Sequence, residues 1–112
     1  MPVVSDAGSV FYAVSQGINI NRGQRYITSG ALATMGFSLP AAIGVCIAND
    51  QKSVVAVTGD GSFQLNIQEL QTIVHYNLPV KIFVINNNGY LSIRQTQARF
   101  FNSRFVGEGV DS

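Results

Sequence analysis

Two apolar runs organise this chain: SVVAVTGDGS at residues 53–62 and VKIFVINNNG at residues 80–89. Apart from Ser53 and Lys81, their first six residues are apolar or β-branched, a pattern typical of parallel strands that are buried on both faces. Between them, residues 64–76 carry apolar side chains close to helical spacing. A strand, a helix and a strand in this order form a right-handed crossover, so the strands at 53–58 and 80–85 are predicted to be parallel.

The rest of the chain extends this unit to an α/β fold. Short strands are predicted at residues 2–5 and 26–28, helices at residues 10–16 and 39–49, and a glycine-containing loop at residues 29–38. We therefore expect an open, mainly parallel sheet flanked by helices. At 112 residues the chain forms one domain at most, or part of one.

The charge content is about half that of an ordinary soluble domain. Only 12% of residues are Asp, Glu, Lys or Arg, and the formal net charge is +1, whereas about 25% is usual. The apolar runs are far shorter than the ~20 residues of a membrane span, and no basic stripe suits a nucleic acid. We therefore expect much of the surface to be covered by other parts of a larger assembly.

The single cysteine, Cys46, lies in an Ala/Ile/Val helical pattern. It is expected to be a buried packing residue, because one cysteine forms neither an internal disulfide nor a zinc pattern. The N-terminus has no basic region followed by an apolar one, as a secretory signal would have. These features favour a cytoplasmic protein.

Polar, glycine-containing turns follow both predicted strands of the crossover unit. Asp60 and Gly61 follow the first strand, and Asn86–Asn88 with Gly89 follow the second. Because parallel strands end at the same edge of a sheet, these turns are expected to lie side by side, where ligands bind in open α/β sheets. One carboxylate, amide oxygens and a backbone carbonyl suit Mg²⁺ better than zinc, with an anionic ligand completing the shell.

At these residues the sequence resembles a known family. The run 59–62 (Gly-Asp-Gly-Ser) followed by Asn86-Asn87 resembles the thiamine-diphosphate-binding motif. Residues 29–44 and 64–70 resemble corresponding segments of acetolactate synthase, so the resemblance covers nearly the whole chain. It implies the thiamine-diphosphate-binding fold, with residues 1–112 as a single, truncated diphosphate-binding domain and with the pyrimidine-binding and central domains of the family absent.

The resemblance also implies roles for individual residues. The metal ligands would be Asp60, the Asn87 side chain and the Gly89 carbonyl, with cofactor diphosphate oxygens completing the Mg²⁺ shell. The remaining cofactor-binding residues are Gly8 and Ser9 near the diphosphate, Gly61 and Ser62 through their amides, Ala33 through its carbonyl, Met35 as the support of the bent cofactor, and Tyr90 in the pocket wall.

The function implied is that of a 2-oxo-acid decarboxylating carboligase acting on a substrate such as pyruvate. No catalytic residue is expected within this chain, because the family's activating glutamate comes from another domain, and neither Glu69 nor Glu108 matches it. The resemblance further implies a homodimer or homotetramer of the full-length enzyme, and FAD would be held by the central domain if it is bound at all. We expect the 112-residue chain alone to be inactive.

One difference from the family bears on the function. The family's branched-chain enzymes carry a tryptophan between two glutamines, whereas this chain reads Gln95-Thr96-Gln97 and contains no tryptophan. Two alternatives to the carboligase therefore remain open. One is a related 2-oxo-acid decarboxylase of a specialised pathway, and the other is a non-catalytic phosphate-binding or interaction module.

His75 is expected to lie away from the site. Phe100, Phe101 and Phe105 are expected at an interface.

Overall fold

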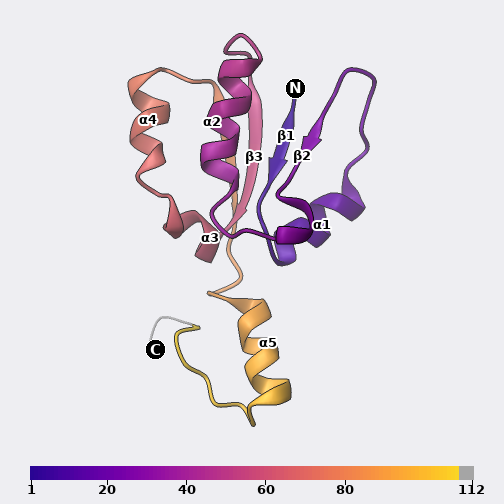
Figure 1. Cartoon of the computed structure of the whole chain (residues 1–112), viewed down its shortest axis with the longest axis vertical. Coiled ribbons are helices and arrows are strands. Elements are labelled where there is room, and N and C mark those ends of the chain that lie inside the picture. The colour runs from indigo at the N-terminus through magenta and orange to yellow at the C-terminus, as the bar shows by residue number, and fades with distance from the viewer. Residues whose placement is uncertain (109–112) are drawn as a thin grey trace.

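A computed structural model describes residues 1–108 of the chain. Its four strands form one sheet in the order β2-β1-β3-β4, and every neighbouring pair is parallel. Figure 1 shows β2, β1 and β3 side by side. The strands are β1 (Val3–Ser5), β2 (Tyr26–Ile27), β3 (Val54–Gly59) and β4 (Val80–Ile85). The predicted open parallel α/β sheet is thus confirmed.

The helices connect these parallel strands. They are α1 (Ser9–Gly17), the 3₁₀ turn η1 (Gly30–Leu32), α2 (Ser38–Ala48), α3 (Asp60–Leu65), α4 (Glu69–His75) and α5 (Leu91–Phe100). Within residues 1–108, no helix is long and apolar enough to cross a membrane.

The order of the strands reverses between β1 and β3. From β1 the chain crosses outward to β2, and it then returns past β1 to reach β3 and moves on to β4. Such a reversal opens a crevice at the carboxyl ends of the two central strands, where the loops diverge to opposite faces. The register of β3 and β4, from Val54 opposite Val80 to Gly59 opposite Ile85, brings their polar turns to this same edge.

The hydrophobic core lies between the sheet and helices α2 and α4. It contains Val4, Val54 and Ala56 from the strands, together with Leu39, Ala42 and Cys46 from α2, and Ile73 and Leu78 from the crossover. Along β3, Val54, Ala56 and Thr58 are fully buried, whereas the alternate residues are partly buried. This cluster therefore lies on the face of the sheet that α2 and α4 cover.

Two predictions about the crossover unit are corrected. The helix expected over residues 64–76 is two short helices, because α3 ends before Asn66. The Asn66 side chain donates to the Gly36 carbonyl oxygen at 2.7 Å. An asparagine that bonds to backbone in this way favours a helix end over a helix interior, so α3 and α4 are separated at residues 66–68.

The second strand of the crossover is not buried on both faces as predicted. β4 is an edge strand, and Phe83, Val84 and Ile85 remain 56%, 45% and 39% exposed. Within residues 1–108, α2 and α3 pack against β4, whereas α1 packs against β1 and β3. The apolar composition of β4 therefore matches a buried strand, but in the described part of the chain its outer residues stay exposed.

Cys46 is fully buried, as predicted, and its thiol donates to the Lys52 carbonyl oxygen at 3.4 Å. Burial raises the pKa of the Cys46 thiol above its ordinary value of 9.0. Because the thiolate is the reactive form, we expect Cys46 of the native chain to resist Ellman's reagent at pH 8 and to react fully in denaturant.

The same shift gives a pH dependence. Above pH 9 the unfolded chain loses the Cys46 proton while the folded chain retains it, so the free energy of unfolding decreases as the pH rises. Urea unfolding at pH 8 and pH 10, compared with a Cys46→Ala variant, isolates this contribution. An equal change of the free energy of unfolding in the two chains would contradict this pH dependence, and rapid labelling of the native chain at pH 8 would contradict the predicted resistance of Cys46 to Ellman's reagent.

Candidate functional site

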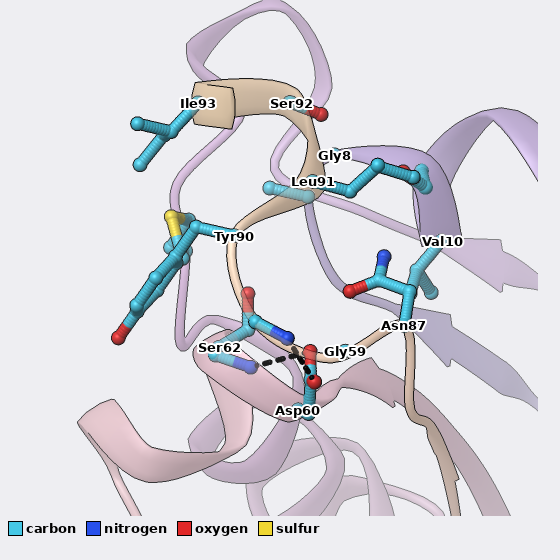
Figure 2. Close-up of a pocket in the computed structure, with 15 residues that line it drawn as sticks. Gly8, Val10, Gly59, Asp60, Ser62, Asn87, Tyr90, Leu91, Ser92 and Ile93 are labelled. Carbon is cyan, nitrogen blue, oxygen red and sulfur yellow. Dashed lines mark hydrogen bonds between the residues drawn. The ribbon is translucent and has the colours of Figure 1, made fainter. Parts of the chain in front are cut away.

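A pocket lies at the carboxyl ends of the central strands, where the strand order reverses (Figure 2). Its walls come from the turn after β1, from the β3–α3 junction, and from the segment that joins β4 to α5. The lining residues are Ala7, Gly8, Ser9, Val10, Met35, Gly59, Asp60, Gly61, Ser62, Asn87, Gly89, Tyr90, Leu91, Ser92 and Ile93. Together with Met35 from the loop before α2, three stretches far apart in the sequence therefore build one site.

Asp60 links two of these walls. Its Oδ1 accepts from the Gly61 amide at 2.9 Å, and its Oδ2 accepts from the Gly89 amide at 2.8 Å (Figure 2). Gly89 has a φ of 104°, a left-handed conformation that glycine adopts readily. The carboxylate thus fixes the turn after β4 against the end of β3.

The Asn87 side-chain oxygen and the Gly89 carbonyl oxygen lie beside this carboxylate, so that three oxygens are gathered here. The Asn87 side-chain oxygen lies 3.2 Å from Asp60 Oδ1 and also contacts the Gly89 carbonyl oxygen. An exchange of the Asn87 amide oxygen and nitrogen would turn both approaches into hydrogen bonds. The Asn87 amide group thus meets an acceptor on two sides, the Asp60 carboxylate and the Gly89 carbonyl. A hard cation such as Mg²⁺ would hold the amide with its oxygen toward them, whereas without a cation the exchanged orientation supplies the two protons. The donor set therefore fits such a cation.

Most of the other residues singled out from the sequence line the same pocket. Gly8, Ser9, Met35, Gly61, Ser62 and Tyr90 are all among its lining residues. Ala33 is not: it lines an adjacent hollow, together with Phe11, Tyr12 and Tyr26, and that hollow shares Gly8 and Ser92 with the pocket. Ala33 has a φ of 47°, in the left-handed region that costs a residue with a Cβ about 1 kcal/mol.

Gly61 is required by the close approach of Tyr90. A Cβ built on Gly61 would meet the Tyr90 ring, with Cδ1 only 2.7 Å away. We expect Gly61→Ala to displace Tyr90 and the turn that carries Asn87, and to weaken any ligand of this pocket about tenfold or more, since supporting residues of a metal site have effects of this size.

Gly44→Ala is the matched control for Gly61→Ala. Gly44 lies in α2, and an added Cβ would find no atom within 4 Å. This change should leave ligand affinity unchanged and stabilise the fold by about 0.5–1 kcal/mol, because alanine favours a helix interior. Ligand titration and urea unfolding of both variants test the pair. Equal affinities for the two variants would contradict the role of Gly61.

Sequence reasoning missed Asp6, which is 1% exposed. Its Oδ1 accepts from the Ala7 and Gly36 amides at 2.9 and 3.0 Å, and its Oδ2 accepts from the Ser38 amide at 2.9 Å and from the Thr58 hydroxyl at 3.4 Å. The carboxylate thus joins β1, β3 and the loop that carries Met35. The only signal was an aspartate directly after an apolar strand, which resembles an ordinary turn.

Several residues lie outside the main pocket. Glu69 begins α4, where its Oε2 accepts from the Thr72 hydroxyl at 3.0 Å. His75 ends α4 and is exposed beside Tyr76, as expected of a residue away from the site. Gln97 exchanges two hydrogen bonds with the backbone of Val106, at 2.9 and 3.2 Å. Neither glutamine of the Gln95–Gln97 stretch lines the pocket.

The comparisons with known proteins agree with this arrangement. Residues 6–111 match the family described as thiamine pyrophosphate enzyme, C-terminal TPP binding domain. The chain is 47% identical over 91 residues to an acetolactate synthase of Arthrospira platensis, which covers 81% of this chain and 16% of that protein. It is 42% identical over 103 residues to the acetolactate synthase isozyme 2 large subunit of Escherichia coli K12, covering 92% of this chain and 19% of that protein.

A third relative is the acetolactate synthase large subunit of Cyanidium caldarium, which is 43% identical over 102 residues, covering 91% of this chain and 17% of that protein. The chain thus spans less than a fifth of the length of these relatives. The family match extends across the β1 turn, the Asp60 turn and the Asn87 turn. The chain therefore belongs to the thiamine pyrophosphate enzymes and corresponds to their C-terminal, TPP-binding domain.

Proposed function

We propose that this domain binds thiamine diphosphate through Mg²⁺, with Asp60, the Asn87 side chain and the Gly89 carbonyl as the protein's metal ligands. The convergence of these three oxygens is the observation that carries the proposal. Asp60 contributes the negative charge, and the two neutral oxygens leave the cation positive. A bound Mg²⁺ would therefore attract the cofactor diphosphate.

The remaining pocket residues are assigned by their position. Ser62, which is 5% exposed, offers its backbone amide to the diphosphate. The Gly61 amide was expected to do the same, but it donates to Asp60 and so holds the carboxylate in place. Gly8 and Ser9 lie on the opposite wall, at the start of α1. Met35 supports the cofactor from the loop that Asp6 anchors, and Tyr90 closes the site over Gly61.

The reaction proposed for the whole protein is decarboxylation of a 2-oxo acid such as pyruvate, followed by joining of the product to a second carbonyl compound. Bound thiamine diphosphate supplies the electron sink that makes loss of CO₂ feasible. This chain's residues bind and orient the cofactor, and the activating glutamate is assigned to another domain. We therefore expect no turnover of pyruvate by the 112-residue chain with cofactor and Mg²⁺.

The exposed apolar residues support a role within a larger assembly. Phe100, Phe101 and Phe105 are 69%, 59% and 47% exposed, so they do not belong to the core of this domain. Together with the exposed part of β4, they supply apolar surface that further domains or a second subunit of a homodimer or homotetramer would cover.

Calorimetric titration tests the proposal. The chain is titrated with thiamine diphosphate in the presence of Mg²⁺, and then in the presence of EDTA. Saturable binding that requires Mg²⁺ is the expected result. Binding of equal strength in EDTA would favour a phosphate-binding module that needs no metal, and no binding even with the partner domains present would favour a module that acts only in protein interactions. Either outcome would overturn the proposal.

A further inference from the structure

The guanidinium of Arg94 faces the turn that connects β4 to α5. Arg94 lies on the first turns of α5, and its Nη1 donates to the Asn88 carbonyl oxygen at 2.6 Å, while its Nη2 donates to the Asn87 carbonyl oxygen at 3.0 Å. Two successive carbonyls are thus held by one planar group. Neither of these backbone carbonyls belongs to the oxygen cluster, which consists of the Asp60 carboxylate, the Asn87 side-chain oxygen and the Gly89 carbonyl.

The geometry of the peptide bond gives this contact its consequence. In a trans peptide the C=O of one residue and the N–H of the next point in opposite directions within one plane. The plane between Asn88 and Gly89 is held at its oxygen by Arg94 and at its N–H by Asp60 Oδ2, at 2.8 Å. Its orientation is therefore fixed from both ends.

The preceding plane is held in the same way. Between Asn87 and Asn88, the oxygen accepts from Arg94, and the N–H donates to the Asn86 side chain at 2.9 Å. These two planes join the residues that carry the Asn87 side chain and the Gly89 carbonyl. Asn88 adopts a φ of 63°, a left-handed conformation that the four contacts stabilise.

Arg94 is itself fixed by Glu108. Its Nη1 lies 3.3 Å from the Glu108 carboxylate in an ion pair in which the two side chains are 25% and 16% exposed. The Glu108 carbonyl also accepts from the Tyr90 amide at 3.1 Å. A lysine would bring the charge of Arg94 but not its two coplanar N–H groups, since an ammonium is a point donor on a flexible stem.

From these contacts we propose that Arg94 is the positioning residue of the oxygen cluster formed by Asp60, Asn87 and Gly89. It holds the two peptide planes on either side of Asn88, and through them it sets where the Asn87 side chain and Gly89 lie. The plane that contains the Gly89 carbonyl is held at the Tyr90 amide by the carbonyl of Glu108, the ion-pair partner of Arg94. The part of this proposal that concerns a cation rests on the proposed function. The part that concerns the turn stands on the hydrogen bonds alone.

Amide hydrogen exchange tests the turn without any metal. In Arg94→Ala and Arg94→Lys, the Asn88 and Gly89 amides should exchange about tenfold faster, because one end of each plane is released and local opening becomes easier. The amides of β3 should keep their rates. Arg99→Ala, which removes an exposed arginine on the same helix, is the matched control and should change neither set.

Mn²⁺ titration, followed by electron paramagnetic resonance, tests the link to the cation. Wild-type chain and Arg99→Ala should bind alike, and both Arg94 variants should bind about tenfold more weakly. Unchanged exchange at Asn88 and Gly89, equal acceleration in β3, or wild-type behaviour of Arg94→Lys would overturn the proposal for Arg94. Absence of Mn²⁺ binding by the wild-type chain would instead count against the proposed function, and the exchange rates would still decide the role of Arg94.

Discussion

Asp60→Ala should abolish the Mg²⁺-dependent binding of thiamine diphosphate. Two losses combine in this variant. The proposed metal site loses its only protein carboxylate, and the Gly89 amide loses the acceptor that holds the turn after β4 in place at 2.8 Å. Since hard cations depend on charged oxygen ligands, the affinity should fall by about a hundredfold or more. Calorimetric titration with and without Mg²⁺ measures the loss.

Asp60→Asn sharpens the experiment because it keeps the shape of the side chain and removes the charge. Each Asp60 oxygen accepts from a backbone amide, so the asparagine NH₂ group must face one of these N–H donors. Binding should remain strongly impaired, whereas circular dichroism should report an intact fold for both variants. Full Mg²⁺-dependent affinity in Asp60→Ala would contradict the metal assignment.

The second large effect is expected at Asp6, and it concerns the free energy of unfolding. Asp6→Ala leaves the buried amides of Ala7, Gly36 and Ser38 without their acceptor. An unsatisfied buried N–H costs about 1–3 kcal/mol, so the variant should lose about 3–5 kcal/mol, a large part of the 5–15 kcal/mol that stabilises a typical domain. Urea unfolding, followed by far-ultraviolet circular dichroism, measures the change.

The comparison of Asp6→Asn with Asp50→Asn separates the effect of the buried position from the effect of replacing a carboxylate by an amide. Both variants replace a carboxylate by an amide, but Asp50 is exposed and has a φ of 53°, which asparagine tolerates. Asp50→Asn should change the free energy of unfolding by less than about 0.5 kcal/mol. Asp6→Asn should cost about 1–3 kcal/mol, because its NH₂ group must face the N–H groups that the carboxylate now accepts. Equal stability of the two would rule out the anchoring role of Asp6.

The crossover unit and the meeting of its two turns were predictable from local patterns. An apolar run followed by a polar glycine turn specifies a buried strand and the point where it ends, and the handedness of crossovers then makes β3 and β4 parallel. From these two facts alone, Asp60 and Asn87 were expected at one edge of the sheet. The in-register pairing of Gly59 with Ile85 agrees with that expectation.

The residues that hold the site together were not predictable in this way. Asp6 reaches Gly36 over 30 positions, and Asn66 reaches Gly36 over another 30. No local period records such pairs, so Asp6 resembled a turn residue and residues 64–76 resembled one helix. Arg94 was likewise indistinguishable from a pocket-lining or exposed arginine until the carbonyls of Asn87 and Asn88 were placed opposite it.

The burial of β4 likewise depends on local sequence only in part. The composition of β4 indicates that the strand is compatible with burial on both faces, because the transfer of apolar and β-branched side chains out of water is favourable. Whether a covering element is present depends on how distant segments pack, and within residues 1–108 the outer residues of β4 remain exposed. Local pattern thus specified the strands, their direction and the chemistry at their ends. Tertiary structure decided the contacts of Asp6, Asn66 and Arg94, because each joins backbone groups that only the completed fold brings within hydrogen-bonding distance.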